Sequence, residues 1–158
     1  DYMLLNADKL SGWNVSMEKS VGGLEYIGFS RLSANRLICI SSQKITVMDC
    51  EKTTIKECDG DYDESALLAV CDELSGEELV IAGQYGGELP DNTIQGEHIF
   101  VSEKRNGRLV KYKVEFVTKQ QKRIMIYDDY GYYTCGFSYD GNYFAFASDA
   151  GVCILKRI

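Results

Sequence analysis

Carboxylates are the side chains of this chain with the clearest capacity to bind ions or take part in chemistry. Residues 59–64 read Asp-Gly-Asp-Tyr-Asp-Glu, and alternating aspartates can offer oxygen ligands to calcium. An EF-hand loop beginning at Asp59 would have glycine at position 64 and glutamate at position 70, where this chain has Glu64 and Val70. Calcium is therefore the weaker interpretation of the run. We predict that it acts through its charge, with no metal and no cofactor.

Patterns typical of catalysis are missing from the sequence. His98 is the one histidine, and its neighbours form no nucleophile or metal signature. Residues 83–87 are rich in glycine, but no helical pattern follows them to cradle a phosphate. The paired carboxylates at 72–73 and 77–78 fall in a predicted turn, where water is their ordinary partner. The sequence predicts that the protein is not an enzyme.

Charge is distributed very unevenly along the chain. Residues 49–97 contain fourteen acidic residues and two lysines, whereas residues 104–123 contain eight basic residues and one glutamate. This asymmetry predicts an acidic face and a basic edge. A solvated surface that keeps the protein soluble is one interpretation of the acidic face. The other is a binding surface for a basic protein, because complementary charge accelerates encounter and enforces specificity.

Tyrosines add a second feature typical of interfaces. Six of them fall within residues 127–143, and tyrosine combines a large apolar area with a polar tip. Tyr130 and Tyr139 lie in predicted turns, so we expect them to be exposed. A nucleic-acid partner is not expected, because Tyr112 lies on the opposite face of its strand from its flanking lysines and the sequence pI is about 4.8. The predicted partner-binding residues are Asp59, Asp61, Asp63, Glu64, Asp72, Glu73, Glu77, Glu78, Tyr85, Glu88, Asp91, Tyr130 and Tyr139.

The six cysteines and the hydropathy indicate a compartment. No pair of cysteines shows the spacing of a zinc knuckle, and Cys39, Cys71, Cys135 and Cys153 fall inside predicted strands. We expect buried thiols in a reducing cytoplasm, with three disulfides in a secreted protein as the alternative. No stretch approaches the roughly 18–20 apolar residues of a membrane-spanning helix, and no signal peptide is visible. No membrane association is expected.

The elements that must position these residues follow an internal repeat. A strand-turn-strand pattern occurs at 28–41, 70–83 and 136–148. Leu37 and Leu79 are 42 residues apart, the spacing of one four-stranded propeller blade, and an insertion delays the third copy. Further short strands are expected upstream of each copy, at 13–17, 53–58 and 123–127, and downstream, at 45–48, 99–101 and 152–155.

The third copy carries the most characteristic run. Residues 137–155 read Phe-Ser-Tyr-Asp-Gly-Asn-Tyr-Phe-Ala-Phe-Ala-Ser-Asp-Ala-Gly-Val-Cys-Ile-Leu. This run resembles a blade of a WD-repeat or WD-like β-propeller, although Leu155-Lys156 stands in place of the closing Trp-Asp pair. Across roughly residues 13–158 the resemblance implies an all-β fold of propeller-like repeats of four-stranded antiparallel sheets. It implies little about activity, because propellers host many unrelated functions.

The number of repeats leaves the arrangement open. The sequence predicts one domain, residues 1–158, with about three units at 13–49, 53–117 and 122–157, whereas propellers typically have four to eight blades. The last unit has three strands, and the strand near Trp13 is expected to supply its fourth, which would close the three units into a ring. An open stack of sheets, a half-propeller completed by a second copy of the chain, and a fragment of a larger propeller are all compatible. Residues 2–5 predict one strand left over.

The insertion in the second unit is expected to form a loop and a hairpin. The loop spans residues 85–96, and residues 97–102 pair with 108–117 through Asn106-Gly107, a signal for a type I′ turn. Charged and apolar residues alternate along 109–116, as in a sheet with one side in water. The sequence thus predicts a cytoplasmic protein-binding module, most concretely a small acidic inhibitor or immunity-type protein that occludes a basic partner such as a toxin nuclease. The alternative is a structural scaffold or part of a larger β-propeller.

Overall fold

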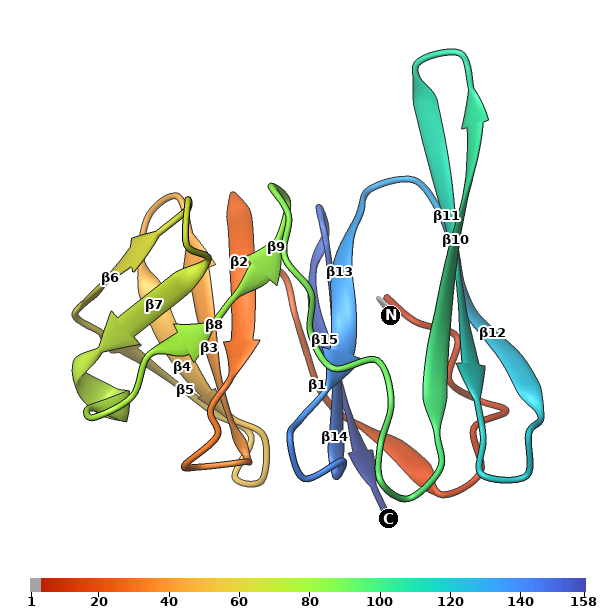
Figure 1. Cartoon of the computed structure of the whole chain (residues 1–158), viewed down its shortest axis with the longest axis horizontal. Helices are drawn as coiled ribbons and strands as arrows, with labels where there is room; N and C mark the ends of the chain where they lie inside the picture. Colours follow the sequence, from red (N-terminus) through yellow and green to blue (C-terminus); the bar gives the residue numbers. More distant parts are fainter. Residues whose placement is uncertain (1–3) are drawn as a thin grey trace.

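The computed structural model describes residues 4–158 as fifteen β-strands and one short 3-10 helix. The strands form four antiparallel sheets that stand side by side in a row (Figure 1). Within these residues no sheet closes on itself, and the sheets at the two ends of the row lie far from each other (Figure 1). The described chain is therefore an open all-β stack.

One of the two central sheets joins the beginning of the chain to its end. Its order is β1-β15-β14-β13, and Trp13 pairs with Arg157. This pairing confirms that the strand near Trp13 supplies the fourth strand of the last copy. It does not close a ring, because the described sheets form an open row. The inner strand β14 is buried along its whole length, as its continuous apolar run predicts. The strands are β1 (Trp13–Lys19), β13 (Tyr132–Phe137), β14 (Tyr143–Ser148) and β15 (Gly151–Arg157).

The other central sheet is formed mainly by the first copy of the repeat. Strands β2 to β5 follow one another as a meander, and the short β9 is added at the free edge of β2. Gly83 of β9 permits this approach, because a Cβ atom there would lie 1.9 Å from the carbonyl oxygen of Glu25. The strands are β2 (Leu24–Phe29), β3 (Arg36–Ser41), β4 (Ile45–Asp49), β5 (Thr54–Cys58) and β9 (Ala82–Gly83).

The two end sheets have three strands each and lie on opposite sides of the central pair (Figure 1). We call β6-β7-β8 the acidic end sheet, because residues 59–80 contain eight Asp and Glu and no Lys, Arg or His. We call β10-β11-β12 the basic end sheet, because residues 98–129 contain eight of the 17 Lys and Arg residues. Their elements are β6 (Gly60–Asp63), β7 (Leu68–Cys71), the 3-10 helix η1 (Asp72–Leu74), β8 (Leu79–Val80), β10 (His98–Asn106), β11 (Leu109–Val117) and β12 (Arg123–Asp129).

Three hydrophobic clusters fill the spaces between neighbouring sheets and fix their order in the row. One lies between the acidic end sheet and the five-stranded sheet, one between the two central sheets, and one between the four-stranded sheet and the basic end sheet. Burying one large apolar side chain contributes about 1.5–3 kcal/mol, so these clusters hold the stack together. Their members include Ile38 and Leu79, Phe29 and Ala145, and Phe116 and Phe144, respectively.

A linker, residues 84–97, connects the two halves of the row. It passes beside the four-stranded sheet, where the Phe137 N–H donates to the carbonyl oxygen of Pro90 at 2.7 Å. Gly136 makes room for it, because a Cβ atom there would lie 2.4 Å from the Cβ atom of Leu89. The Ile99 N–H then donates to the Asp91 carbonyl oxygen at 2.8 Å, which leads the linker into β10. The path carries the chain across the central sheets, so consecutive sheets end up at opposite ends of the row.

Strand partners differ from the repeat in three places. The strand at 99–101, expected to complete the second unit, belongs to β10 and pairs with β11, at the opposite end of the row from β7 and β8. The strand at 53–58, expected to open the second unit, pairs with β4 and completes the first sheet. The strand at 123–127, expected to open the third unit, pairs with β11 and completes the basic end sheet. These last two strands join the sheet that precedes them, because a short connection favours pairing with the strand just before. The structure accordingly contains four sheets where the sequence predicts about three units.

The predicted hairpin forms with a different turn, whereas the described part of the predicted first strand is not a strand. β10 and β11 pair as expected, but Asn106 pairs with Leu109, so Gly107 and Arg108 form the loop. Gly107 has φ +66 and Arg108 has no positive φ, which matches a type II′ turn and not the predicted type I′ turn. Of the strand predicted at residues 2–5, residues 2 and 3 lie outside the described residues, and Leu4 and Leu5 form a buried bend instead.

Candidate protein-binding surface

The outward side of the acidic end sheet is the first candidate surface. Ala69 and Cys71 are buried toward the neighbouring sheet, so the alternation of β7 directs Leu68 and Val70 outward. The β6 residues opposite them are acidic, since Asp63 pairs with Leu68 and Asp61 with Val70. We call this surface the acidic face; it forms a shallow groove of about 200 Å³ whose lining includes Asp61, Asp63, Leu68, Val70 and Glu78.

The carboxylates of this end of the molecule lack positive partners. Of the eight carboxylates in residues 59–80, Glu73 alone forms an ion pair within the described chain, with Lys56 Nζ at 2.6 Å. The apolar side chain of Val70 lies among these carboxylates and is 45% exposed. Unpaired charges of one sign around an apolar centre produce a strong negative potential at a surface that can still exclude water. This combination can attract and hold a basic surface.

Three predicted binding residues have structural contacts that the sequence did not indicate. Glu77 accepts a hydrogen bond from the Arg31 N–H at 3.1 Å and another from the Ser30 hydroxyl, which ties β8 to the end of β2. Asp72 accepts from the Asp59 N–H at 3.1 Å. Asp63 accepts from two N–H groups of the following turn, at 2.8 and 3.1 Å. Glu77 therefore belongs to the fold, whereas Asp63 also remains on the acidic face.

A tyrosine cluster borders the acidic end sheet. The Tyr26 hydroxyl donates to Glu64 at 3.2 Å, and the Tyr62 hydroxyl donates to Glu25 at 3.1 Å. Burial, followed by the hydrogen bond to Glu64, raises the pKa of Tyr26 to about 12. The Tyr85 ring lies 6.3 Å from the Tyr26 ring and is 65% exposed. The structure thus brings Tyr85 and Glu64 together, and it adds Glu25, which lay outside the acidic run that the sequence singled out.

The remaining predicted residues lie elsewhere. Glu88 and Asp91 are exposed carboxylates of the linker. Tyr139 is half-buried beneath Arg31, whose guanidinium carbon lies 3.9 Å from the ring centre, so it is less exposed than predicted. Tyr130 is 45% exposed, as predicted, but it follows β12 at the opposite end of the row. The predicted residues therefore do not form one continuous surface.

The outward side of the basic end sheet is the second candidate surface. Ile99, Val114 and Phe116 are buried inward, so alternation directs Phe100, Lys113 and their neighbours outward. Phe100 and Met125 both lie beside Glu115 in the register and are 47% and 46% exposed. Lys104 and Lys111 are directly paired on the same side. We call this surface the basic face; it comprises Phe100, Lys104, Lys111, Lys113 and Met125.

The basic face has few internal charge partners. Lys111 Nζ lies 3.8 Å from Asp128, and Arg123 lies 3.4 Å from Glu115. Lys104 and Lys113 form no ion pair within residues 4–158. These exposed lysines confirm the predicted charged side of the hairpin, and Val114 and Phe116 confirm its apolar side.

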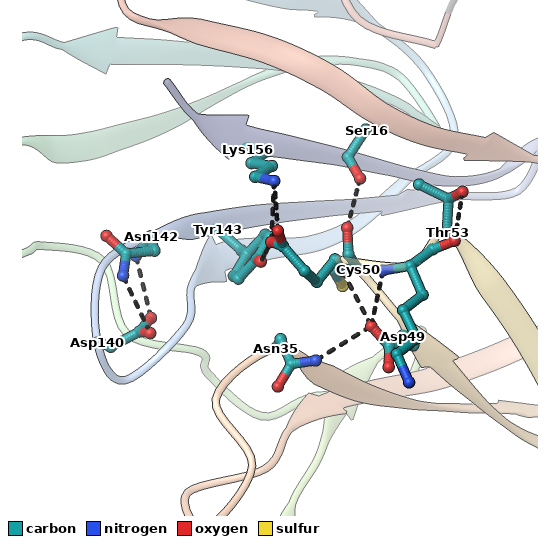
Figure 2. A network of polar contacts seen from close by, with 11 residues as sticks. Ser16, Asn35, Asp49, Cys50, Thr53, Asp140, Asn142, Tyr143 and Lys156 are labelled. Atoms are coloured by element: carbon teal, nitrogen blue, oxygen red, sulfur yellow. Dashed lines mark hydrogen bonds and ion pairs between the residues drawn. The ribbon is translucent and has the colours of Figure 1, made fainter.

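A polar network that sequence reasoning missed joins the two central sheets (Figure 2). Glu51 accepts hydrogen bonds from the Tyr143 hydroxyl and from Lys156 Nζ, the latter at 2.9 Å (Figure 2). Asp49 accepts from the Asn35 amide at 3.0 Å and from N–H groups of its own turn (Figure 2). Burial raises the pKa of Asp49, but these hydrogen bonds together lower it by more than burial raises it. The pKa of Asp49 therefore lies below its usual value. The network holds the sheets in place.

A buried ion pair fixes the end of the linker. Glu97, 2% exposed, accepts from Arg157 Nη1 at 2.5 Å and Nη2 at 2.9 Å, and the Thr93 hydroxyl also donates to it. Burial raises the pKa of Glu97, but the hydrogen bonds and charge of Arg157 lower it below its usual value. The Arg157 guanidinium also lies 4.6 Å from the Trp13 ring. The pair anchors the basic end sheet to the four-stranded sheet.

The histidine and the possible metal ligands of the described residues form no metal-binding cluster. His98 lies edge-on to Phe100, with ring centres 5.0 Å apart. Residues 4–158 contain no group of three or more His, Cys, Asp or Glu side chains positioned to share a metal ion. Nor does any helix of the described chain have the length and hydropathy to cross a membrane.

Comparison with family models, with curated proteins and with solved structures produced no match to the chain. The resemblance to WD-repeat propellers accordingly stays a prediction from residues 137–155.

Proposed function

We propose that the protein is a non-catalytic protein-binding module whose acidic face receives the basic surface of another protein. The observation that carries this proposal is the density of unpaired carboxylates, because Glu73 alone of eight in residues 59–80 has an ion-pair partner in the described chain. Val70, 45% exposed, lies in the middle of the face. A basic partner would thus gain charge pairing at the rim and apolar burial at the centre.

The most concrete form of this function is a small acidic inhibitor or immunity-type protein that occludes a basic partner such as a toxin nuclease. A nuclease needs a positive surface to hold phosphates, and an acidic face competes directly for that surface. Opposite potentials also steer the encounter, so inhibition would be fast at low salt. We place this activity in the cytoplasm, because all six cysteines are free thiols and five of them are buried.

A structural scaffold, or part of a larger WD-like propeller, is the second candidate. It is supported by the row of face-to-face sheets and by the pairing of β1 with β15, which unites strands from distant parts of the chain. In this alternative the faces at the ends of the row are contact surfaces for further sheets and not for an enzyme. The two candidates therefore share the acidic face but differ in what covers it.

The test compares partner capture by the wild type and by a variant carrying Asp61→Asn, Asp63→Asn and Glu78→Gln. The amide at position 63 keeps an oxygen that can accept the turn hydrogen bonds, so the fold should be unchanged. Proteins captured from the native source would be identified by mass spectrometry, and their association would be timed by stopped flow. We expect basic partners, and an on-rate at least tenfold lower in the variant at low salt.

The matched control carries Glu88→Gln and Asp91→Asn, which remove exposed carboxylates outside the acidic face. Its association should keep the wild-type rate and salt dependence. If the acidic-face variant associates as fast as this control, and salt changes neither rate, the acidic face is not the binding surface and the proposed function fails.

A further inference from the structure

Each end sheet has one covered side and one uncovered side. The inward side of the acidic end sheet packs on the five-stranded sheet through Ala69 and Leu79, and that of the basic end sheet packs on the four-stranded sheet through Phe116. The outward sides expose Val70 and Phe100 at 45% and 47%. The other sheet sides pack on a neighbour, except at β5 and along the projecting part of the β10–β11 hairpin, which is exposed on both sides (Figure 1).

The two uncovered sides are complementary in charge. The acidic face presents three carboxylates, Asp61, Asp63 and Glu78, around Leu68 and Val70. On the basic face Phe100 and Met125 flank Glu115, which lies 3.4 Å from Arg123, and the three lysines extend from there along the hairpin. Lys104 and Lys113 have no ion pair in the described chain, so they are the charges that the carboxylates of the acidic face can pair with.

One chain cannot bring its own two faces together. Only the short strand β9 and the linker separate β8 from β10 in the sequence. Between β8 and β10 the chain nevertheless passes both central sheets. β9 is held on β2, Pro90 is held by Phe137, and Glu97 is held by Arg157, so the linker is anchored along its length. The acidic and basic faces are consequently fixed at opposite ends of the row (Figure 1).

We propose that a second copy of this chain covers both faces, with the acidic face of each copy on the basic face of the other. The inference rests on the proposed function, in that it keeps the acidic face as the binding surface and makes a second copy of the chain, in place of another protein, the partner that this face receives. Such a contact is head-to-tail, and two of them close into a pair when the two end faces turn toward the same side of the row; the closed pair then satisfies both faces of both chains at once.

The test uses two charge-reversal variants of the full chain. One carries Asp61→Lys and Glu78→Lys, so that both of its faces are basic; the other carries Lys111→Glu and Lys113→Glu, so that both are acidic. Each variant alone would bring like charges together, and its self-association should weaken about a hundredfold in dissociation constant. A mixture of the two restores both attractive contacts. We therefore expect two monomeric variants that form a mixed pair.

The measurement is particle mass by light scattering and analytical ultracentrifugation over a range of concentration and salt. The wild type and the equimolar mixture should reach twice the 17.8 kDa chain mass, whereas each variant alone should stay at 17.8 kDa. Control variants with Glu88→Lys and Asp91→Lys, or with Lys119→Glu and Lys122→Glu, change charge equally outside the two faces and should pair like the wild type. Circular dichroism checks that each variant is folded.

Three results would overturn the proposal. They are a wild type that stays at one chain mass at high concentration, variants that pair with themselves as the wild type does, and particles that grow beyond two copies. A monomeric wild type that still captures basic proteins through the acidic face would refute the second copy and leave the proposed function standing. If the wild type is monomeric and the variant with Asp61→Asn, Asp63→Asn and Glu78→Gln also captures basic proteins unchanged, the second-copy proposal and the proposed function both fail.

Discussion

Removing the carboxylate of Glu97 should destabilise the fold more than removing any exposed carboxylate. Glu97 is 2% exposed, so no water can replace the hydrogen bonds that it accepts from Arg157 and Thr93. In Glu97→Ala the Arg157 guanidinium keeps the Gly141 carbonyl oxygen at 2.8 Å, but its charge is left uncompensated and mostly buried. Breaking a buried pair in this way typically costs about 3–5 kcal/mol.

The assay is the free energy of unfolding from urea denaturation, together with the melting temperature. For a domain of this size each kcal/mol changes the melting temperature by roughly 2–4 °C, so Glu97→Ala should melt about 6–20 °C below the wild type. Glu97→Gln keeps the shape and one acceptor oxygen, and it should lose about 1–3 kcal/mol. The matched control Glu88→Ala, on the exposed part of the linker, should stay within about 0.5 kcal/mol of the wild type.

A double-mutant cycle separates the ion pair from simple loss of packing. Arg157→Met removes the buried charge, so adding Glu97→Ala to it should cost much less than Glu97→Ala alone, with a coupling of about 1–3 kcal/mol. Equal losses for Glu97→Ala and Glu88→Ala, or additive losses in the cycle, would show that the pair does not anchor the linker.

Two further predictions follow from the titrating groups. The folded-state pKa values of Asp49 and Glu97 lie below their unfolded values, so their contribution to stability is complete above about pH 4.3 and is lost as the pH falls through the folded values. The free energy of unfolding in urea should therefore decrease below that pH, and less steeply in Glu97→Gln; identical slopes would contradict the assignment. Burial raises the pKa of the Cys39, Cys50 and Cys153 thiols to about 12, so iodoacetamide at pH 8 should react slowly with the folded protein. In denaturant without reductant all six cysteines should be modified, and a mass showing three disulfides would refute the cytoplasmic assignment.

Local patterns predicted the elements of the fold better than their partners. The alternation along residues 109–116 identified the covered and uncovered sides of β11, and the apolar run of β14 identified a buried inner strand. Which sheet a strand joins depends on tertiary packing, and periodicity carries no information on it. The strands at 53–58 and 123–127 have the same alternating character whether they pair backward or forward, so the repeat placed them in the wrong units.

The candidate site was predicted in composition and missed in detail for a similar reason. The excess of carboxylates in residues 59–80 is visible in the sequence, and their exposure follows from their charge. The contact of Glu77 with Arg31 joins residues 46 apart in the chain, and that of Glu51 with Tyr143 joins residues 92 apart. Only the stacking of the sheets makes such pairs neighbours. Sequence could therefore indicate how much charge the surface carries but not which carboxylates are free to bind.

The linker explains why binding should occur at the ends of the row and not at its edges. The edges of β2 and β13 are covered, because β9 pairs with β2 and the Pro90 carbonyl accepts from the β13 residue Phe137. The outer strand β5 remains uncovered, but its exposed Lys56 and Glu57 oppose pairing with another strand. With these three edges covered or charged, exposed apolar side chains and charges without an ion pair come together on the acidic and basic faces. In the proposed function, a partner that gains both apolar burial and charge pairing therefore approaches the stack end-on, and a flat surface of opposite charge fits this approach best.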